Sequence, residues 1–155
     1  MDSDILLLGI LAVDGTVRIE LFLAAVLIIT LDQVSKRIAI ERVRNAPSPS
    51  SRARIHVIAN PSLGLGFVRT LRLLLALWII ATIGTLLLVH NVDALHGRAP
   101  QIALGAALGG ATSNVFDKIR RGAVIDFVDL RVWPIFNLAD AAIVIGVLAA
   151  SWLIL

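Results

Sequence analysis

The residues best suited to chemistry lie in one polar stretch of a chain that is otherwise rich in aliphatic side chains. They are Asn114, Asp117, Asp126, Asp129, Asn137 and Asp140. Four of the eleven acidic residues of the protein are among them. An ionised carboxylate beside long apolar runs loses hydration at a high cost, so acids retained in such a place mark a functional site. We therefore predict that the site lies between residues 114 and 140.

Asp126 and Asp140 are the pair of carboxylates that can meet at a membrane surface. Asp140 stands at the start of an expected helix, near the positive end of the helix dipole, and Asp126 belongs to an extended segment before it. Two carboxylates that lie close together share one proton, which raises the pKa of one of them. The ionised member can take a proton from water while the protonated member polarises a carbonyl group or protonates a leaving amine. This pair predicts a hydrolase.

Two other interpretations stay open on the residues alone. The acids could instead form ion pairs with Lys118, Arg120, Arg121 and Arg131 on a hydrated loop, and Asp129 fits this best because it lies two positions from Arg131. A proton-coupled transporter would spread its carboxylates through the depth of the membrane, whereas these cluster at one end. The chain has no cysteine and no histidine in this stretch, so we expect no metal and no cofactor.

The composition predicts a membrane protein that forms a single domain over residues 1–155. Hydrophobic residues make up 58% of the chain and charged residues 16%, and the mean hydropathy is +0.91. A soluble domain carries about 25% charged residues. Because a membrane-spanning helix needs about 20 mainly apolar residues, we expect an all-α membrane protein with four transmembrane helices, at 19–40, 71–89, 101–116 and 138–155.

The connections between these helices are expected to carry a small β element outside the membrane. Segments 55–58 and 123–130 favour strands because β-branched residues recur in them. The connections at 42–68 and 118–136 should lie on the same face as the acidic residues. The apolar part of residues 1–17 is too short to span a bilayer, so we expect an interfacial or loosely packed N-terminal extension.

Three motifs, in this order and spacing, resemble those of the lipoprotein signal peptidases, or signal peptidase II. That family comprises bacterial four-span membrane aspartic endopeptidases. The motifs are Gly-Gly-x-x-x-Asn-x-x-Asp-Lys from Gly109, Val-Ile-Asp-Phe around Asp126, and Phe-Asn-Leu-Ala-Asp up to Asp140. The stretch Leu-Asp-Gln-Val-Ser-Lys, which ends at Lys36, resembles the first motif of the family. The resemblance extends from about residue 19 onward.

The resemblance implies the removal of signal peptides from prolipoproteins, by cleavage before a diacylglyceryl-modified cysteine. Asp126 and Asp140 match the catalytic pair. Supporting or substrate-binding roles carry over to Asn114, Asp117, Lys118, Asn137, Asp32, Lys36, Asn60 and Gly64. The implied partners are lipid-modified prolipoproteins and membrane lipids, without nucleic acid, and we expect a monomer.

The distribution of basic residues conflicts with the orientation that the family implies. Twelve of the fourteen Lys and Arg residues fall on the face that carries the acidic residues. The positive-inside rule would place that face in the cytoplasm, whereas the family has its active site at the outer face of the cytoplasmic (inner) membrane. We follow the motifs and expect a multi-pass protein whose site faces outward.

Three positions depart from the pattern of the family. Ser113 replaces a glycine that usually precedes the asparagine. Lys118 replaces an arginine, which removes a planar bidentate donor. Segment 60–67 matches the family only with two extra residues. These departures favour an alternative, a divergent inactive relative that binds signal peptides or lipidated segments without cutting them, whereas the presence of Asp126 and Asp140 favours an active enzyme.

Overall fold

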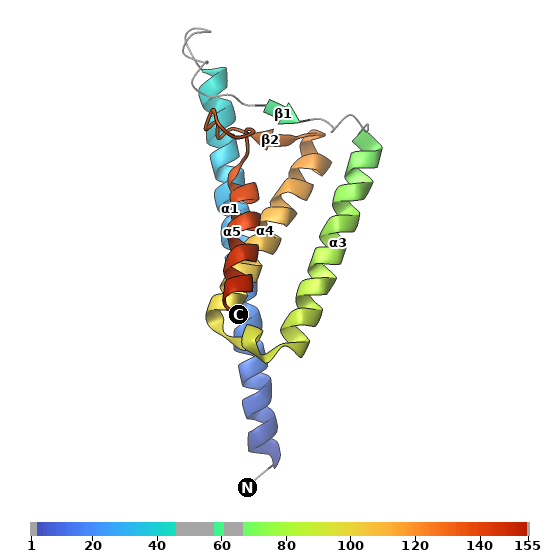
Figure 1. Ribbon diagram of the computed structural model, residues 1–155, viewed down its shortest axis with the longest axis vertical. Coiled ribbons are helices and arrows are strands. Elements are labelled where there is room, and N and C mark those ends of the chain that lie inside the picture. Colours follow the sequence, from blue (N-terminus) through green and yellow to red (C-terminus); the bar gives the residue numbers. More distant parts are fainter. Residues whose placement is uncertain (1–2, 46–57, 61–66, 155) are drawn as a thin grey trace.

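The computed structural model describes residues 3–45, 58–60 and 67–154, with side chains for 19–45 and 68–154. Within these residues, four long helices support one small antiparallel sheet (Figure 1). The helices are α1 (Ser3–Arg44), α3 (Phe67–Asn91), α4 (Arg98–Arg121) and α5 (Leu138–Trp152), and a short 3-10 helix, η1 (Asp93–His96), precedes α4. The strands are β1 (Ile58–Asn60) and β2 (Val124–Asp126). The predicted architecture, four helices with a small β element, is confirmed.

The first helix is longer than predicted. It runs without a break from Ser3, so residues 3–17 continue the first span as helix, where the sequence predicted a separate interfacial or loosely packed extension. No proline precedes Pro47, and an isolated glycine inside a helix costs only about 1 kcal/mol relative to alanine. Nothing local therefore ends the helix before Arg44.

The sheet is smaller than the predicted strands. Asp126 pairs with Ile58 and Val124 with Asn60, whereas residues 55–57 and 61–66, including Gly64, lie outside the described residues. The predicted strand over 123–130 ends at Asp126, because the backbone N–H of the next residue, Phe127, donates to the Phe136 carbonyl instead of continuing the pairing with β1.

Helix α4 is the central helix, and its glycines let its neighbours approach closely. A Cβ atom on Gly105 would lie 2.2 Å from the carbonyl oxygen of Leu21 in α1. A Cβ atom on Gly110 would lie 2.4 Å from the carbonyl oxygen of Ala139 in α5. Small residues at helix contacts permit this close packing in lipid, and α1 and α5 are therefore held against two sides of α4.

Helix α3 meets α4 near η1 and diverges from it toward the sheet (Figure 1). The indole of Trp78 donates a hydrogen bond to the Thr112 hydroxyl at 2.9 Å, which links the two helices. By length and composition, one helix of the described residues can cross a membrane, at Val68–Asn91, whereas the apolar helix at Leu138–Trp152 is shorter. Large apolar residues on all four helices are exposed, which fits contact with lipid.

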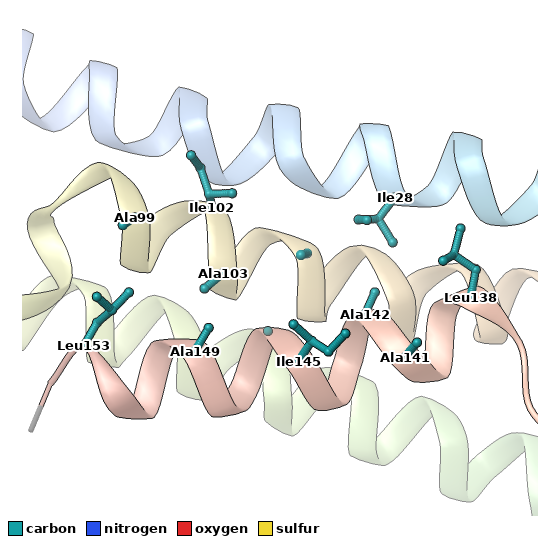
Figure 2. Close-up of a pocket in the computed structure, with 12 residues that line it drawn as sticks. Ile28, Ala99, Ile102, Ala103, Leu138, Ala141, Ala142, Ile145, Ala149 and Leu153 are labelled. Carbon is teal, nitrogen blue, oxygen red and sulfur yellow. The ribbon is translucent and has the colours of Figure 1, made fainter.

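An apolar groove of about 520 Å³ runs along α4 and α5 (Figure 2). Its lining comes from α1, α4 and α5 and consists of Ile28, Ala99, Ile102, Ala103, Ala106, Leu138, Ala141, Ala142, Ile145, Gly146, Ala149 and Leu153. None of the polar residues singled out in the sequence lines it. The chemistry that the sequence predicts must therefore lie elsewhere, at the end of the helices that carries the sheet.

Candidate active site

Asn137 and Asp140 form a capping box at the start of α5. The Asn137 side-chain oxygen accepts a hydrogen bond from the Asp140 backbone N–H at 2.9 Å. In return, Asp140 Oδ2 accepts from the Asn137 backbone N–H at 3.2 Å. This reciprocal arrangement satisfies N–H groups that a helix leaves free at its first turn. The Asn-Leu-Ala-Asp sequence therefore fixes the Asp140 carboxylate at the positive end of the helix dipole.

Two asparagines bridge the Asp140 carboxylate to that of Asp126. The Asn137 amide donates to Asp126 Oδ1 at 2.7 Å and to Asn114 Oδ1 at 3.2 Å. The Asn114 amide in turn donates to Asp140 Oδ1 at 2.8 Å. The structure thus brings together four residues that the sequence predicted, from α4, from the end of β2 and from the start of α5.

Burial distinguishes Asp126 from an ordinary surface aspartate. Its exposed fraction is 8%. Loss of hydration raises the pKa of Asp126, the hydrogen bond from Asn137 lowers it in part, and the nearby charge of Asp140 raises it further. The net shift of the Asp126 pKa is upward, so Asp126 stays protonated to a higher pH than a free aspartate does.

Behind this pair, Lys36 is enclosed by acidic and amide groups. Its ammonium nitrogen lies 2.6 Å from Asp32 Oδ2 and 2.7 Å from Asp117 Oδ2, and all three side chains are fully buried. It also donates to Asn114 Oδ1 at 3.1 Å. A buried charge needs such partners, because an unpaired one is strongly destabilising. Lys36 therefore holds the same Asn114 amide that contacts Asp140.

Asp32 links three helices. Its Oδ2 accepts from the Ser113 hydroxyl of α4 at 2.7 Å, and its Oδ1 accepts from the backbone N–H of Ala139 in α5 at 2.9 Å. Ala139 directly precedes Asp140, so a side chain of α1 supports the first turn of α5. Ser113, which departs from the family pattern, has a defined place in this contact.

Two further residues complete the network: Gln33, which the sequence did not single out, and Arg121, which it named only as a possible ion-pair partner of the acids. Gln33 donates to Asp117 Oδ1 at 3.0 Å and to Ser113 Oγ at 2.9 Å. Arg121 forms an ion pair with Asp117 and donates to Gln33 Oε1 at 3.1 Å. A local signal existed for Arg121, which lies four positions after Asp117 and shares its helix face. Gln33 is next to Asp32 in the sequence, but its partners Ser113 and Asp117 are far away in the sequence, so no local pattern indicated these contacts.

The remaining sequence-predicted residues that the structure describes come from α4, from the loop after β2 and from β1. Lys118 is 1% exposed. Asp129 Oδ1 accepts from the Arg131 backbone N–H at 2.7 Å, within a turn of the following loop. Asn60 ends β1, opposite Val124 of β2. The described part of the chain contains no group of three or more His, Cys, Asp or Glu side chains placed to hold a metal ion.

Comparisons with known proteins agree with the motifs. A family model described as signal peptidase (SPase) II matches residues 24–155. A lipoprotein signal peptidase of Moorella thermoacetica is 35% identical over 143 residues, which cover 86% of this chain and 91% of that protein. A lipoprotein signal peptidase of Halothermothrix orenii is 32% identical over 128 residues, covering 81% and 88% of the two chains.

Solved structures share the fold. One structure of a bacterial membrane enzyme, determined by the in meso method, has a TM-score of 0.66 and 26% identity, covering 87% of this chain and 92% of that chain. A second has a TM-score of 0.62 and 25% identity, covering 83% of each. These likenesses indicate a bacterial membrane enzyme and a protease. This chain belongs to the signal peptidase II family.

Proposed function

We propose that this protein is an aspartic endopeptidase that removes signal peptides from diacylglyceryl-modified prolipoproteins. The observation that carries the proposal is the bridging of Asp126 and Asp140 by Asn114 and Asn137. The raised pKa of Asp126 favours one protonated and one ionised carboxyl group in the pair. Membership of the signal peptidase II family supports the substrate class.

In the proposed mechanism, the two aspartates exchange protons with water and substrate. Asp140, ionised, takes a proton from a water molecule, whose oxygen attacks the scissile carbonyl carbon. Asp126, protonated, donates to the carbonyl oxygen as it gains negative charge. Asp140, now protonated, then donates its proton to the leaving nitrogen as the C–N bond breaks, and Asp126 takes a proton back from a hydroxyl of the tetrahedral intermediate, which yields a carboxylic acid and an amine. The pair returns to one protonated and one ionised group.

The residues around the pair act as positioning groups in this proposal. Lys36 and Asp32 contact Asn114 and Ala139 respectively, and each of these contacts leads directly to Asp140 or its helix turn. Asp117 fixes Lys36 from the α4 side. The hydroxyl of Ser113 is hydrogen-bonded on both sides, so this departure fits an assembled site and gives no support to an inactive relative.

The proposed location of the site is the outer face of the bacterial cytoplasmic membrane, with the sheet on the same side. This orientation opposes the positive-inside rule. The same substrate would then present its lipidated cysteine at the membrane surface, beside the pair. We propose that the enzyme works as a monomer on a substrate held in the lipid.

The test is cleavage of a diacylglyceryl-modified prolipoprotein by the purified protein in detergent. Asp126→Asn is compared with Asp129→Asn, because Asp129 is an aspartate of the adjacent turn that accepts from the Arg131 backbone N–H. We expect cleavage before the lipidated cysteine by the wild type, its loss in Asp126→Asn and near-normal cleavage in Asp129→Asn. A folded wild-type protein that never cleaves, or an Asp126→Asn variant that still does, would refute the proposal.

A further inference from the structure

The loop that joins Asp126 to Asn137 is a closed hairpin. The Val128 N–H donates to the Phe136 carbonyl at 2.8 Å, and the Phe136 N–H donates to the Val128 carbonyl at 3.2 Å. Inside this closure, Arg131 has a left-handed φ of 62°, stabilised by the bond from its N–H to the Asp129 carboxylate. Residues 129–135, called the hairpin loop below, therefore have a defined shape.

The tip of the hairpin loop is apolar and exposed. The exposed fractions are 55% for Leu130, 90% for Val132 and 68% for Trp133. Val132 has the highest value of any large hydrophobic residue among the side chains that the structure describes. Clustered exposed apolar residues mark contact with a partner or a membrane. Because the loop backbone has a defined shape, it cannot turn all three side chains inward. A partner or a membrane must therefore cover them where they lie.

Exposed apolar side chains also lie below the hairpin loop, on α4 and α1. Phe116 and Ile119 near the end of α4 are 42% and 59% exposed, and Val34 and Ile38 on α1 are 51% and 44% exposed. These apolar side chains extend the lipid-facing surface up to the level of the site. The hairpin loop follows directly, where hydrocarbon gives way to headgroups.

The charge at this level is positive. The exposed basic residues here are Arg37, Arg42, Arg44, Arg120, Arg121 and Arg131. Among the acidic side chains at this end, Glu41 already pairs with Arg37 and Asp129 is engaged in the turn. A loop tip that contains both Arg131 and Trp133 has the composition of an interfacial segment, and basic groups attract anionic lipid headgroups.

The position of the hairpin loop favours bulk lipid as its partner over the substrate. In Figure 1 it lies on the side of α1 and α5, away from α3. The groove of Figure 2 lies below its base, since it ends at Leu138, and no α3 residue lines it. The lipid phase therefore adjoins the hairpin loop.

We propose that the hairpin loop is a membrane anchor, in which Leu130, Val132 and Trp133 insert at the lipid–water boundary and Arg131 binds the phosphate of an anionic lipid. The hairpin loop belongs to the segment that connects Asp126 to Asp140. Its insertion into the membrane therefore fixes the position of the segment that sets the distance between the two aspartates. This second step rests on the proposed function. The exposed residues Arg42, Arg44 and Arg120 then also serve lipid headgroups, which accounts for part of the conflict with the positive-inside rule.

The insertion is tested by tryptophan fluorescence in vesicles. A Trp78→Phe/Trp152→Phe variant leaves Trp133 as the single fluorophore, and lipids brominated near the headgroup or near the chain end report its depth. We expect strong quenching by the shallow bromines, weak quenching by the deep ones and little access for aqueous iodide. Full quenching by iodide with none by either lipid would overturn the proposal.

The lipid preference is tested by titrating brominated phosphatidylglycerol into phosphatidylcholine vesicles. Arg131→Asn removes the charge, and asparagine tolerates the left-handed backbone. Because one basic residue near an anionic surface contributes about 1 kcal/mol, this variant should need about fivefold more phosphatidylglycerol for half-maximal quenching of Trp133. Arg98→Asn, changed at the opposite end where Arg98 pairs with Glu20, is the control and should have no effect. Equal midpoints for Arg131→Asn and the control would refute the phosphate contact.

Neither fluorescence measurement requires cleavage, so the anchor and the proposed enzymatic activity can fail separately. The link between them is tested with Val132→Asp, which places a charge at the tip. In phosphatidylglycerol vesicles we expect at least a tenfold loss of kcat/KM and reduced lipid quenching of Trp133. Unchanged activity together with lost quenching would refute the effect of the anchor on the pair.

Discussion

Asp32 accepts a hydrogen bond from the backbone N–H of Ala139, a residue 107 positions later in the chain and next to Asp140. The first turn of α5 is thus stabilised by a carboxylate from α1 in addition to its own capping box. The same Asp32 is ion-paired with Lys36. The position of Asp140 consequently depends on α1, a helix that is far from Asp140 in the sequence.

Asp32→Asn should slow cleavage without preventing substrate binding. The amide can keep one acceptor for Ala139, but it loses the charge that pairs with Lys36, so the first turn of α5 shifts. A small misplacement of a reacting group can cost about 100-fold in rate, and we expect a loss of about 10- to 100-fold in kcat with little change in KM. Glu41→Gln, on the exposed side of the same helix, is the control. A rise in KM alone would show that Asp32 acts in binding.

The pH dependence of cleavage should report the raised pKa of Asp126. Its folded pKa lies above that of the unfolded chain, so the protonated form persists above the pH at which a free aspartate ionises. The proton that Asp126 must donate is present below the folded pKa of Asp126 and is lost as pH rises through it, so activity declines there. In kcat/KM profiles we expect an alkaline limb displaced upward from the range of an ordinary aspartate. A limb at the ordinary position would contradict the role of Asp126 as the acid.

The same shift predicts how stability changes with pH. A carboxyl with a raised folded pKa contributes stability below its unfolded pKa, and that contribution is lost as pH rises through the folded value. Asp126→Asn removes this dependence. The melting temperature of the variant in detergent should therefore rise relative to wild type as pH increases, and converge with it in acid, where Asp126 is protonated in both states.

Lys36→Ala should destabilise the protein far more than Arg37→Ala. The first change leaves Asp32 and Asp117 buried without their cation, which costs about 3–5 kcal/mol. The second removes an exposed pair with Glu41, worth about 0.3–0.5 kcal/mol. Thermal unfolding in detergent gives the comparison. Equal melting temperatures for these neighbouring variants would mean that Lys36 is not enclosed as described.

Gly110→Ala should impair both stability and cleavage. The new Cβ atom would lie 2.4 Å from the Ala139 carbonyl oxygen, so α5 must move away from α4, with Asp140 in its first turn. Overpacking of this kind costs about 1–3 kcal/mol. Gly84→Ala in α3 is the matched control, since no atom lies within 4 Å of its added Cβ. We expect Gly84→Ala to retain full activity, and equal losses in the two variants would contradict this packing.

The helices and the carboxylate pair could be predicted because their signals are local. Long apolar runs indicate spanning segments, and the spacing of Asn137 and Asp140 indicates a helix start. The continuation of α1 through residues 3–17 was missed because helix length was judged by the apolar run alone, although a helix can extend beyond it. The limit of β2 at Asp126 was missed because the competing partner, Phe136, is ten positions away.

The contacts that assemble the network could not be predicted from local pattern. Gln33 meets Asp117 across 84 positions, and periodicity carries no information about which helix faces meet. The departure at Ser113 favoured a divergent inactive relative by comparison of motifs, yet its hydroxyl donates to Asp32 and accepts from Gln33. Such partners become visible only when α1 and α4 are packed together.

Asn137 caps α5 and holds Asp126 with the same side chain, which has a consequence for the newly made protein. While α5 is still separate from α1 and α4 during insertion into the membrane, its first turn lacks the bond from Ala139 to Asp32, and Asp140 lacks its contact with Asn114. The proposed acid pair then does not exist. On the proposed function, the chain therefore has no assembled catalytic pair until α5 docks against α1 and α4.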